Sequence, residues 1–181
     1  YKVYHTIHPD NSARLGTAII IKDTIHHCEM PKYSTQEIQS TAVEIRTHRH
    51  SILVAAIYSP PRHNIKKVQY LKYLQKQGHR FIIDGDFNAK NTNWGSRLTT
   101  TKGKELLHAI NEIGCLAIST GKLTYWPTDR QKIPDLIDFF LIKNISPNFV
   151  NIEEGSDMNS DHSPILLTLH DRIIHLKNNP F

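Results

Sequence analysis

Short apolar runs separated by polar connections recur along the whole chain, and this pattern is typical of a protein rich in β-strands. A continuous apolar run predicts a buried strand, whereas an alternating run predicts a strand with one exposed face. Seven or eight segments fit one of these patterns: 16–22, 40–47, 52–61, 80–85, 115–120, 137–143, 149–154 and 163–170. The first of them, "GTAIIIK", is expected to be a buried strand.

Two other segments carry apolar residues at helical spacing. They are expected to form helices over about 65–77 and 104–113, and each is followed by a glycine that can end a helix. The apolar positions that define the two buried faces are Ile65, Val68, Leu71 and Leu74 in the first segment, and Leu106, Leu107, Ile110 and Ile113 in the second.

This succession of elements predicts a mixed α+β fold of two packed sheets with the helices outside them. We expect one domain over 1–181, because neither a linker nor an internal repeat interrupts the pattern. No apolar run approaches the roughly 18 residues that a transmembrane helix needs. A turn is expected at 48–51 and a frayed end at 178–181.

Composition adds a preference for a polyanionic partner, because the net charge is +5 and the pI is about 9.2. Cys28 and Cys115 lack a CxxC spacing, so two buried thiols in a reducing, intracellular compartment are expected, with a single disulfide left open. Twelve histidines raise the question of zinc. The pairs His26–His27 and His48/His50 have neither paired cysteines nor an HExxH spacing, which argues against a zinc site.

Three polar clusters each adjoin an expected strand. They are Asp84, Asp86 and Asn88 in "DGDFN", Asp135 and Asp138 in "PDLIDFF", and Asp161 and His162 in "SDHSP". A turn or a buried ion pair could explain each cluster taken alone. Together they supply carboxylates, an amide and an imidazole, which are the groups that hydrolysis of a phosphodiester with a divalent ion requires. Hard oxygen ligands favour Mg²⁺ or Mn²⁺.

Four motifs in order resemble the endonuclease/exonuclease/phosphatase superfamily, which includes apurinic/apyrimidinic endonucleases and DNase I. They are "IYSPP" with Tyr58, "GDFN" with Asp86 and Asn88, "LIDFFL" with Asp138, and "SDHSP" with Asp161 and His162. The finer resemblance is to the endonuclease domain of jockey-type non-LTR retrotransposons, carried by "HPDNSARLGTAIIIK", "GDFNAKNTNWGS", "PDLIDFFLIK" and "SDHSPILLTL".

This resemblance implies a four-layer α/β/β/α sandwich of the DNase I type and Mg²⁺-dependent hydrolysis of DNA. By the same resemblance, His162 is the general base, Asp138 orients it, and Asp86 with Asn88 holds the nucleophile and the scissile phosphate. Tyr58 matches a phosphate-contacting hydroxyl, although an aromatic residue at a strand end can equally serve packing. Asp161 matches a residue at or near the metal.

Other residues near the "GDFN" motif receive roles of their own. Asn93, Trp94 and Ser96 are candidates for a loop that faces DNA, with a core anchor as the alternative for Trp94. Asp84 lies outside the matched motif; we place it out of phase with Asp86 and expect a structural role.

The resemblance also implies features that the chain lacks. The superfamily has an asparagine near its first strand and a metal-binding glutamate in a motif that ends its second main strand, and both would precede Tyr1. The domain is therefore expected to be N-terminally incomplete, without its first strand or strands, and its activity in isolation is in doubt. The alternatives are a catalytically dead remnant or DNA-binding module and a phosphatase of the same superfamily. The parent polypeptide is expected to carry a reverse transcriptase.

Overall fold

A computed structural model describes residues 1–10, 15–46, 50–129 and 131–170. The turn expected at 48–51 lies partly outside these ranges, and the frayed end expected at 178–181 lies wholly outside them. The elements are β1 (Lys2–Ile7), β2 (Gly16–Ile21), β3 (His27–Glu29), β4 (Tyr33–Ser34), β5 (Gln39–Arg46), β6 (Ser51–Tyr58), α1 (Lys67–Gln75), β7 (Phe81–Asp86), η1 (Thr92–Trp94), α2 (Thr101–Ile113), β8 (Leu116–Ile118), β9 (Asp138–Lys143), η2 (Pro147–Phe149), β10 (Val150–Glu154) and β11 (Ile165–Leu169).

A seven-stranded mixed sheet forms the centre of the molecule. Its strand order is β3-β5-β6-β7-β9-β8, with β4 paired to the side of β5. Strands β6 and β7 run parallel, whereas the other pairs of this sheet are antiparallel. The carboxyl ends of β6 and β7 therefore meet the start of β9 at one edge of the sheet, where polar side chains of three strands can converge.

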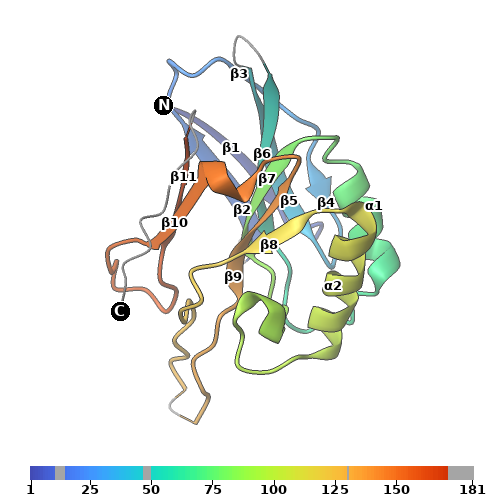
Figure 1. Ribbon diagram of the computed structural model, residues 1–181, viewed down its shortest axis with the longest axis vertical. Helices are drawn as coiled ribbons and strands as arrows, with labels where there is room; N and C mark the ends of the chain where they lie inside the picture. Colours follow the sequence, from blue (N-terminus) through green and yellow to red (C-terminus); the bar gives the residue numbers. More distant parts are fainter. Residues whose placement is uncertain (11–14, 47–49, 130, 171–181) are drawn as a thin grey trace.

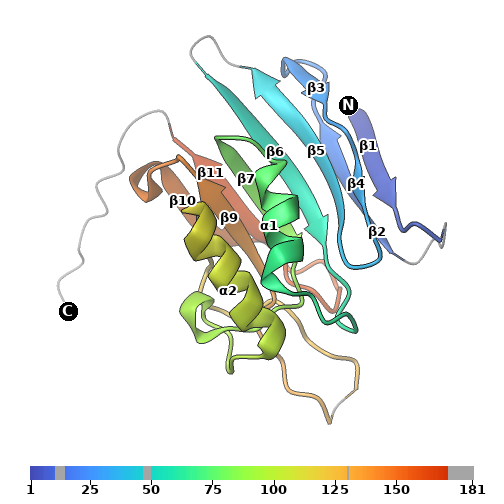
Figure 2. The same cartoon turned by 90° about the vertical axis from the view of Figure 1, so that its right-hand side faces the viewer.

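Helices α1 and α2 cover one face of this sheet, and two two-stranded ribbons cover the other (Figures 1 and 2). The helix side packs on a large core that includes Phe81, Ile83 and Leu141. On the opposite face, Ile82, Phe140 and Ile142 pack against the β10–β11 ribbon. The β1–β2 ribbon lies over β5, where the Oγ1 of Thr17 is 2.8 Å from that of Thr41. The expected mixed sheet with two helices is confirmed.

Several details of the sequence prediction need correction. Strand β2 is not a buried strand, because Ile20 on it is 69% exposed while Ile21 is buried. On α1, Val68 is exposed, and the buried face consists of Tyr70, Tyr73 and Leu74. Strands β1, β3 and β4 were not expected, and they are too short or too polar to show a strong apolar run.

Both cysteines of the chain are free thiols. Cys115 is buried as expected, but Cys28 on β3 is only partly buried and lies 3.7 Å from the Glu44 carboxylate. No helix among the described residues is long and apolar enough to cross a membrane.

Candidate active site

Three neighbouring strands bring Tyr58, Asp86 and Asp138 into one row. In the sheet register, Tyr58 of β6 pairs with Asp86 of β7, and Asp86 pairs with Asp138 of β9. Paired residues of adjacent strands project on the same face. Tyr58 and Asp86 are 28 positions apart in the sequence, and Asp86 and Asp138 are 52 positions apart. The sheet nevertheless makes them neighbours where β6 and β7 end.

Asp86 and Asn88 form a compact turn directly after β7. The Asn88 backbone N–H donates to Asp86 Oδ1 at 2.8 Å, and the Asn88 side-chain amide donates to Oδ2 at 2.6 Å. Asn88 itself has φ 45°, a left-handed conformation that asparagine tolerates better than most residues. This turn fixes the direction of both polar side chains at the strand end.

Gly85 makes the close approach of β7 to β6 possible. A Cβ atom at this position would lie 2.0 Å from the Ile57 carbonyl oxygen, and the φ of 141° is itself unfavourable for other residues. The glycine between the two aspartates is therefore required for packing of β7 against β6, and the aspartates on either side of it supply the carboxylates.

His162 joins the row from the loop before β11. Its Nδ1 lies 2.9 Å from Asp138 Oδ2, and the hydrogen bond to this carboxylate is the main reason that the pKa of His162 is raised. The Tyr125 ring packs beside the imidazole, with 4.9 Å between ring centroids. A carboxylate on Nδ1 fixes the tautomer that leaves a lone pair on Nε2, which is the arrangement of a general base held by an acid.

Burial changes the electrostatics of the neighbouring carboxyls. Desolvation and then the charge of Asp138 raise the pKa of Asp86 to about 7, against the opposing influence of the Asn88 backbone N–H and, after it, of His162 and Lys102. Desolvation also raises the pKa of Tyr58, with a contribution from the charge of Asp86. Groups with such perturbed pKa values that lie side by side on neighbouring strands are candidates for function.

Asp84 lies on the same face of β7 as Asp86, because the two residues are two positions apart on a strand. Our placement of Asp84 out of phase with Asp86 was therefore wrong. Its Oδ1 is buried without a hydrogen-bond partner, and desolvation followed by the Asp138 charge raises its pKa to about 7. With Asp138 and His162, Asp84 lines a hollow of about 550 Å³.

Asp135, which the sequence grouped with Asp138, does not enter this row. It is fully buried, accepts the Arg97 and Leu136 backbone N–H groups, and pairs with Lys90 Nζ at 3.0 Å. Burial alone would raise the pKa of Asp135, but the N–H of Arg97 and the Lys90 ammonium hold it below its usual value. Asp135 ties the loop after the "GDFN" motif to the start of β9.

The loop residues expected to face DNA divide into two groups. Trp94 is buried, donates its Nε1–H to the Ala89 carbonyl and stacks on Phe139, so it is the core anchor. Ser96 is also buried and donates its hydroxyl to the Leu136 carbonyl at 2.7 Å, so neither side chain can face DNA directly. Asn93 is exposed and stays a candidate contact.

The connection between β8 and β9 supplies residues that the sequence prediction missed. The Thr124 hydroxyl accepts the backbone N–H groups of Ile137 and Asp138, both at 3.0 Å, while the Thr124 carbonyl accepts the N–H of Ser163. Trp126 donates its backbone N–H to the Asp161 carbonyl at 2.7 Å. These hydrogen bonds hold the segments that carry Asp138 and His162 together. In the sequence, the only signal for this connection was the pair of aromatic residues that follows Thr124.

Asp161 is exposed at the rim of the site. No group of three or more histidine, cysteine or acidic side chains is placed to hold a metal ion in the part of the chain that the structure describes. Mg²⁺ often uses only one or two protein carboxylates and retains several waters, so the oxygen donors present are of a suitable chemical type.

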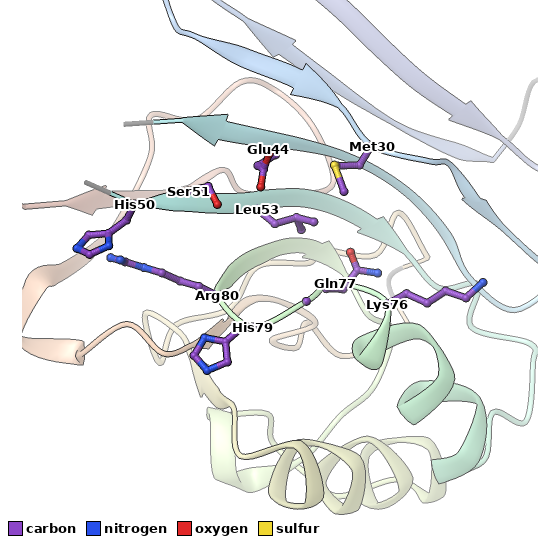
Figure 3. A pocket seen from close by; sticks show the side chains of 10 residues that line it. Met30, Glu44, His50, Ser51, Leu53, Lys76, Gln77, His79 and Arg80 are labelled. Carbon is purple, nitrogen blue, oxygen red and sulfur yellow. The ribbon is translucent and has the colours of Figure 1, made fainter. Parts of the chain in front are cut away.

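A second hollow, of about 350 Å³, lies at the opposite end of β6 and β7 (Figure 3). Its lining includes Lys76, His79 and Arg80, but Lys76 and His79 point in different directions. It therefore shows no convergent set of groups comparable to the row of Tyr58, Asp86 and Asp138.

Comparison with known proteins agrees with this geometry. The family model described as endonuclease-reverse transcriptase matches residues 52–166, and the chain belongs to this family. It is 31% identical over 94% of its length to the RNA-directed DNA polymerase from mobile element jockey of Drosophila melanogaster, and 29% identical to that of Drosophila funebris. The chain spans about 19% of the length of each of these relatives.

A solved structure supports the fold assignment. The endonuclease domain of TRAS1, a telomere-specific non-LTR retrotransposon, superposes with a TM-score of 0.77 over 93% of this chain and 79% of that one. The sequences are 22% identical, so the likeness concerns the fold. The chain therefore has the DNase I-like fold that the sequence predicted.

Proposed function

We propose that this chain is a metal-dependent DNA endonuclease domain that nicks target DNA for retrotransposon integration. The observation that carries the proposal is the His162–Asp138 pair, which lies beside Asp86 and Tyr58 at one strand edge. The jockey relatives, of which the chain spans about 19%, support a longer polypeptide that also carries a reverse transcriptase.

In this proposal His162 takes a proton from the attacking water at Nε2, while Asp138 stabilises the imidazolium that forms. Asp86 and Asn88 orient the water and the phosphodiester, and the Tyr58 hydroxyl donates to a phosphate oxygen. Asp161 is the candidate ligand of Mg²⁺ or Mn²⁺, which when bound would neutralise charge on the phosphate.

The test is nicking of supercoiled plasmid with Mg²⁺, by both the 181-residue chain and the longer polypeptide. Substitution His162→Ala is expected to lower the rate roughly 10²–10⁴-fold, as loss of a general base does. His108→Ala, a change of an exposed histidine on α2, is the matched control and should leave the rate unchanged. Equal rates for the unmodified protein and His162→Ala would contradict the role of His162.

A DNA-binding module without catalysis is the second candidate. It is favoured by the net charge of +5, which suits a polyanionic partner whether or not the chain is catalytic. DNA binding by both proteins without any nicking would support it. Release of phosphate from inositol lipids without nicking would instead indicate a phosphatase.

A further inference from the structure

Lys102, in the first turn of α2, is a buried cation that the proposed chemistry does not use. Only 8% of its surface is exposed. Lysine is rarely buried to this extent, because removal of the ammonium group from water is costly unless it has partners. Burial lowers the pKa of Lys102 to about 8, against the opposing influence of Asp86.

The ammonium group has two backbone partners at the end of β6. Lys102 Nζ donates to the Ser59 carbonyl at 3.0 Å and to the Pro60 carbonyl at 2.8 Å. These residues directly follow Tyr58. Two carbonyls held by one cation fix the path of the chain where β6 ends, and hydrogen bonds to a charged group are stronger than neutral ones.

The same turn is bonded to β7. The Ser59 backbone N–H donates to the Asp86 carbonyl at 2.9 Å, so Ser59 links Lys102 on one side to Asp86 on the other. The register pairs Tyr58 with Asp86 at this point. Movement of the Ser59 peptide would therefore shift both candidate site residues.

We propose that Lys102 is a positioning residue of the candidate active site, whose ammonium group fixes the end of β6 so that Tyr58 and Asp86 keep their side-by-side arrangement. The catalytic part of this inference rests on the proposed endonuclease function. The structural part concerns the Lys102–Ser59–Asp86 connection and can be measured without metal or DNA.

The experiment compares Lys102→Met with Lys104→Met in the 181-residue chain. Both substitutions remove one positive charge from the same helix, but Lys104 is exposed. Lys102→Met is expected to lower kcat for plasmid nicking roughly 10- to 100-fold with KM changed less than about threefold, because small misplacements of reacting groups have effects of this size. Lys104→Met should leave both constants within about twofold.

Hydrogen exchange gives a second readout that does not depend on activity. The Ser59 amide should exchange about tenfold faster in Lys102→Met than in Lys104→Met, whereas amides of central β9, such as that of Leu141, should exchange equally in both. Faster exchange throughout the chain would show a general loss of stability and would overturn the positioning role.

The two proposals can fail separately. If the unmodified chain nicks DNA and Lys102→Met retains the parental kcat, the positioning role is overturned while the endonuclease function stands. If neither the unmodified chain nor the longer polypeptide nicks DNA, the endonuclease function fails, and an unchanged Ser59 exchange rate would still overturn the inference about Lys102. Should Lys102→Met not fold, Lys102→Leu, which likewise removes the N–H donors, is measured in the same way and judged by the same outcomes.

Discussion

Two carboxylates two positions apart on β7 show how position within one strand decides the surroundings of a residue. Asp86 lies at the strand end, where the Asn88 amide groups satisfy both of its oxygens. Asp84 lies deeper on the same face, and its Oδ1 is buried without a partner. A buried carboxylate without compensating hydrogen bonds costs stability when it is charged.

Asp84→Asn is expected to stabilise the domain at neutral and alkaline pH. The pKa of Asp84 is raised to about 7 in the folded state, above the ordinary value of 3.8. The native state therefore binds the proton more tightly, and stability falls as pH rises between about 4 and 7. Substitution with asparagine should raise the free energy of unfolding by about 1–4 kcal/mol at pH 8 and have little effect at pH 4.

Urea unfolding of the metal-free chain at both pH values measures this difference. Asp129→Asn, at an exposed aspartate, is the control and should change neither value. If Asp84→Asn raised the free energy of unfolding equally at pH 4 and pH 8, removal of a buried charge would not be the cause.

The pH dependence of nicking should reflect the His162–Asp138 pair. The hydrogen bond between His162 and Asp138 raises the pKa of His162 above the ordinary 6.5. The imidazole is therefore protonated, and inactive as a base, over a wider acidic range. The acidic limb of kcat/KM is expected to have its midpoint above 6.5. Asp138→Asn should move this midpoint to lower pH as well as reduce the rate, and a midpoint that moves upward would contradict the pairing.

At the scale of elements, the packing of α2 against the preceding loop fixes the position of the site. The helix begins at an N-cap, Thr100, whose hydroxyl accepts the Gly103 N–H. At Gly103 a Cβ atom would lie 1.8 Å from the Lys90 carbonyl oxygen. Only glycine lets the first turn of α2 lie so close to the loop that carries Lys90 and Trp94.

Gly103→Ala should destabilise the domain by about 3 kcal/mol, because the added methyl group forces the helix and the loop apart. Alanine favours the helix itself, so a helix-propensity effect alone would have the opposite sign. Chemical denaturation, followed by the fluorescence of buried Trp94 and exposed Trp126, measures the change. Lys104→Ala on the exposed face of α2 is the control, with an expected effect within about 0.5 kcal/mol.

At the scale of the whole molecule, the net charge of +5 predicts salt-dependent binding to DNA. Each phosphate neutralised by Lys or Arg releases counterions, so the logarithm of the affinity should fall linearly with the logarithm of salt concentration. For about four phosphate contacts, the affinity should drop roughly 10²-fold between 50 and 200 mM salt. Fluorescence anisotropy with a labelled duplex measures it, and an affinity independent of salt would exclude binding through the DNA backbone.

Much of the fold could be predicted because its strands and helices carry strong local patterns. The apolar run of β6 ends at two prolines, and the apolar face of α2 ends at a glycine, so both elements were found close to their observed bounds. The buried face predicted for the first helical segment was right at Ile65 and Leu74 but wrong at Val68, because Tyr70 and Tyr73 make the contact with the core. Spacing alone cannot reveal that tyrosines, rather than Val68, make this contact.

The sequence by itself determined the residue types of the candidate site and the strand ends on which they lie, because motif spacing and apolar runs are local properties. Only the tertiary structure decided which of these residues meet. The register placed Tyr58, Asp86 and Asp138 in one row, whereas packing of the loops kept Asp135 out of it and buried Trp94 and Ser96. Packing of α2 placed Lys102 next to the carbonyl groups that follow β6. These are contacts between segments far apart in the chain, and packing of the sheet and helices, rather than local sequence, determines them.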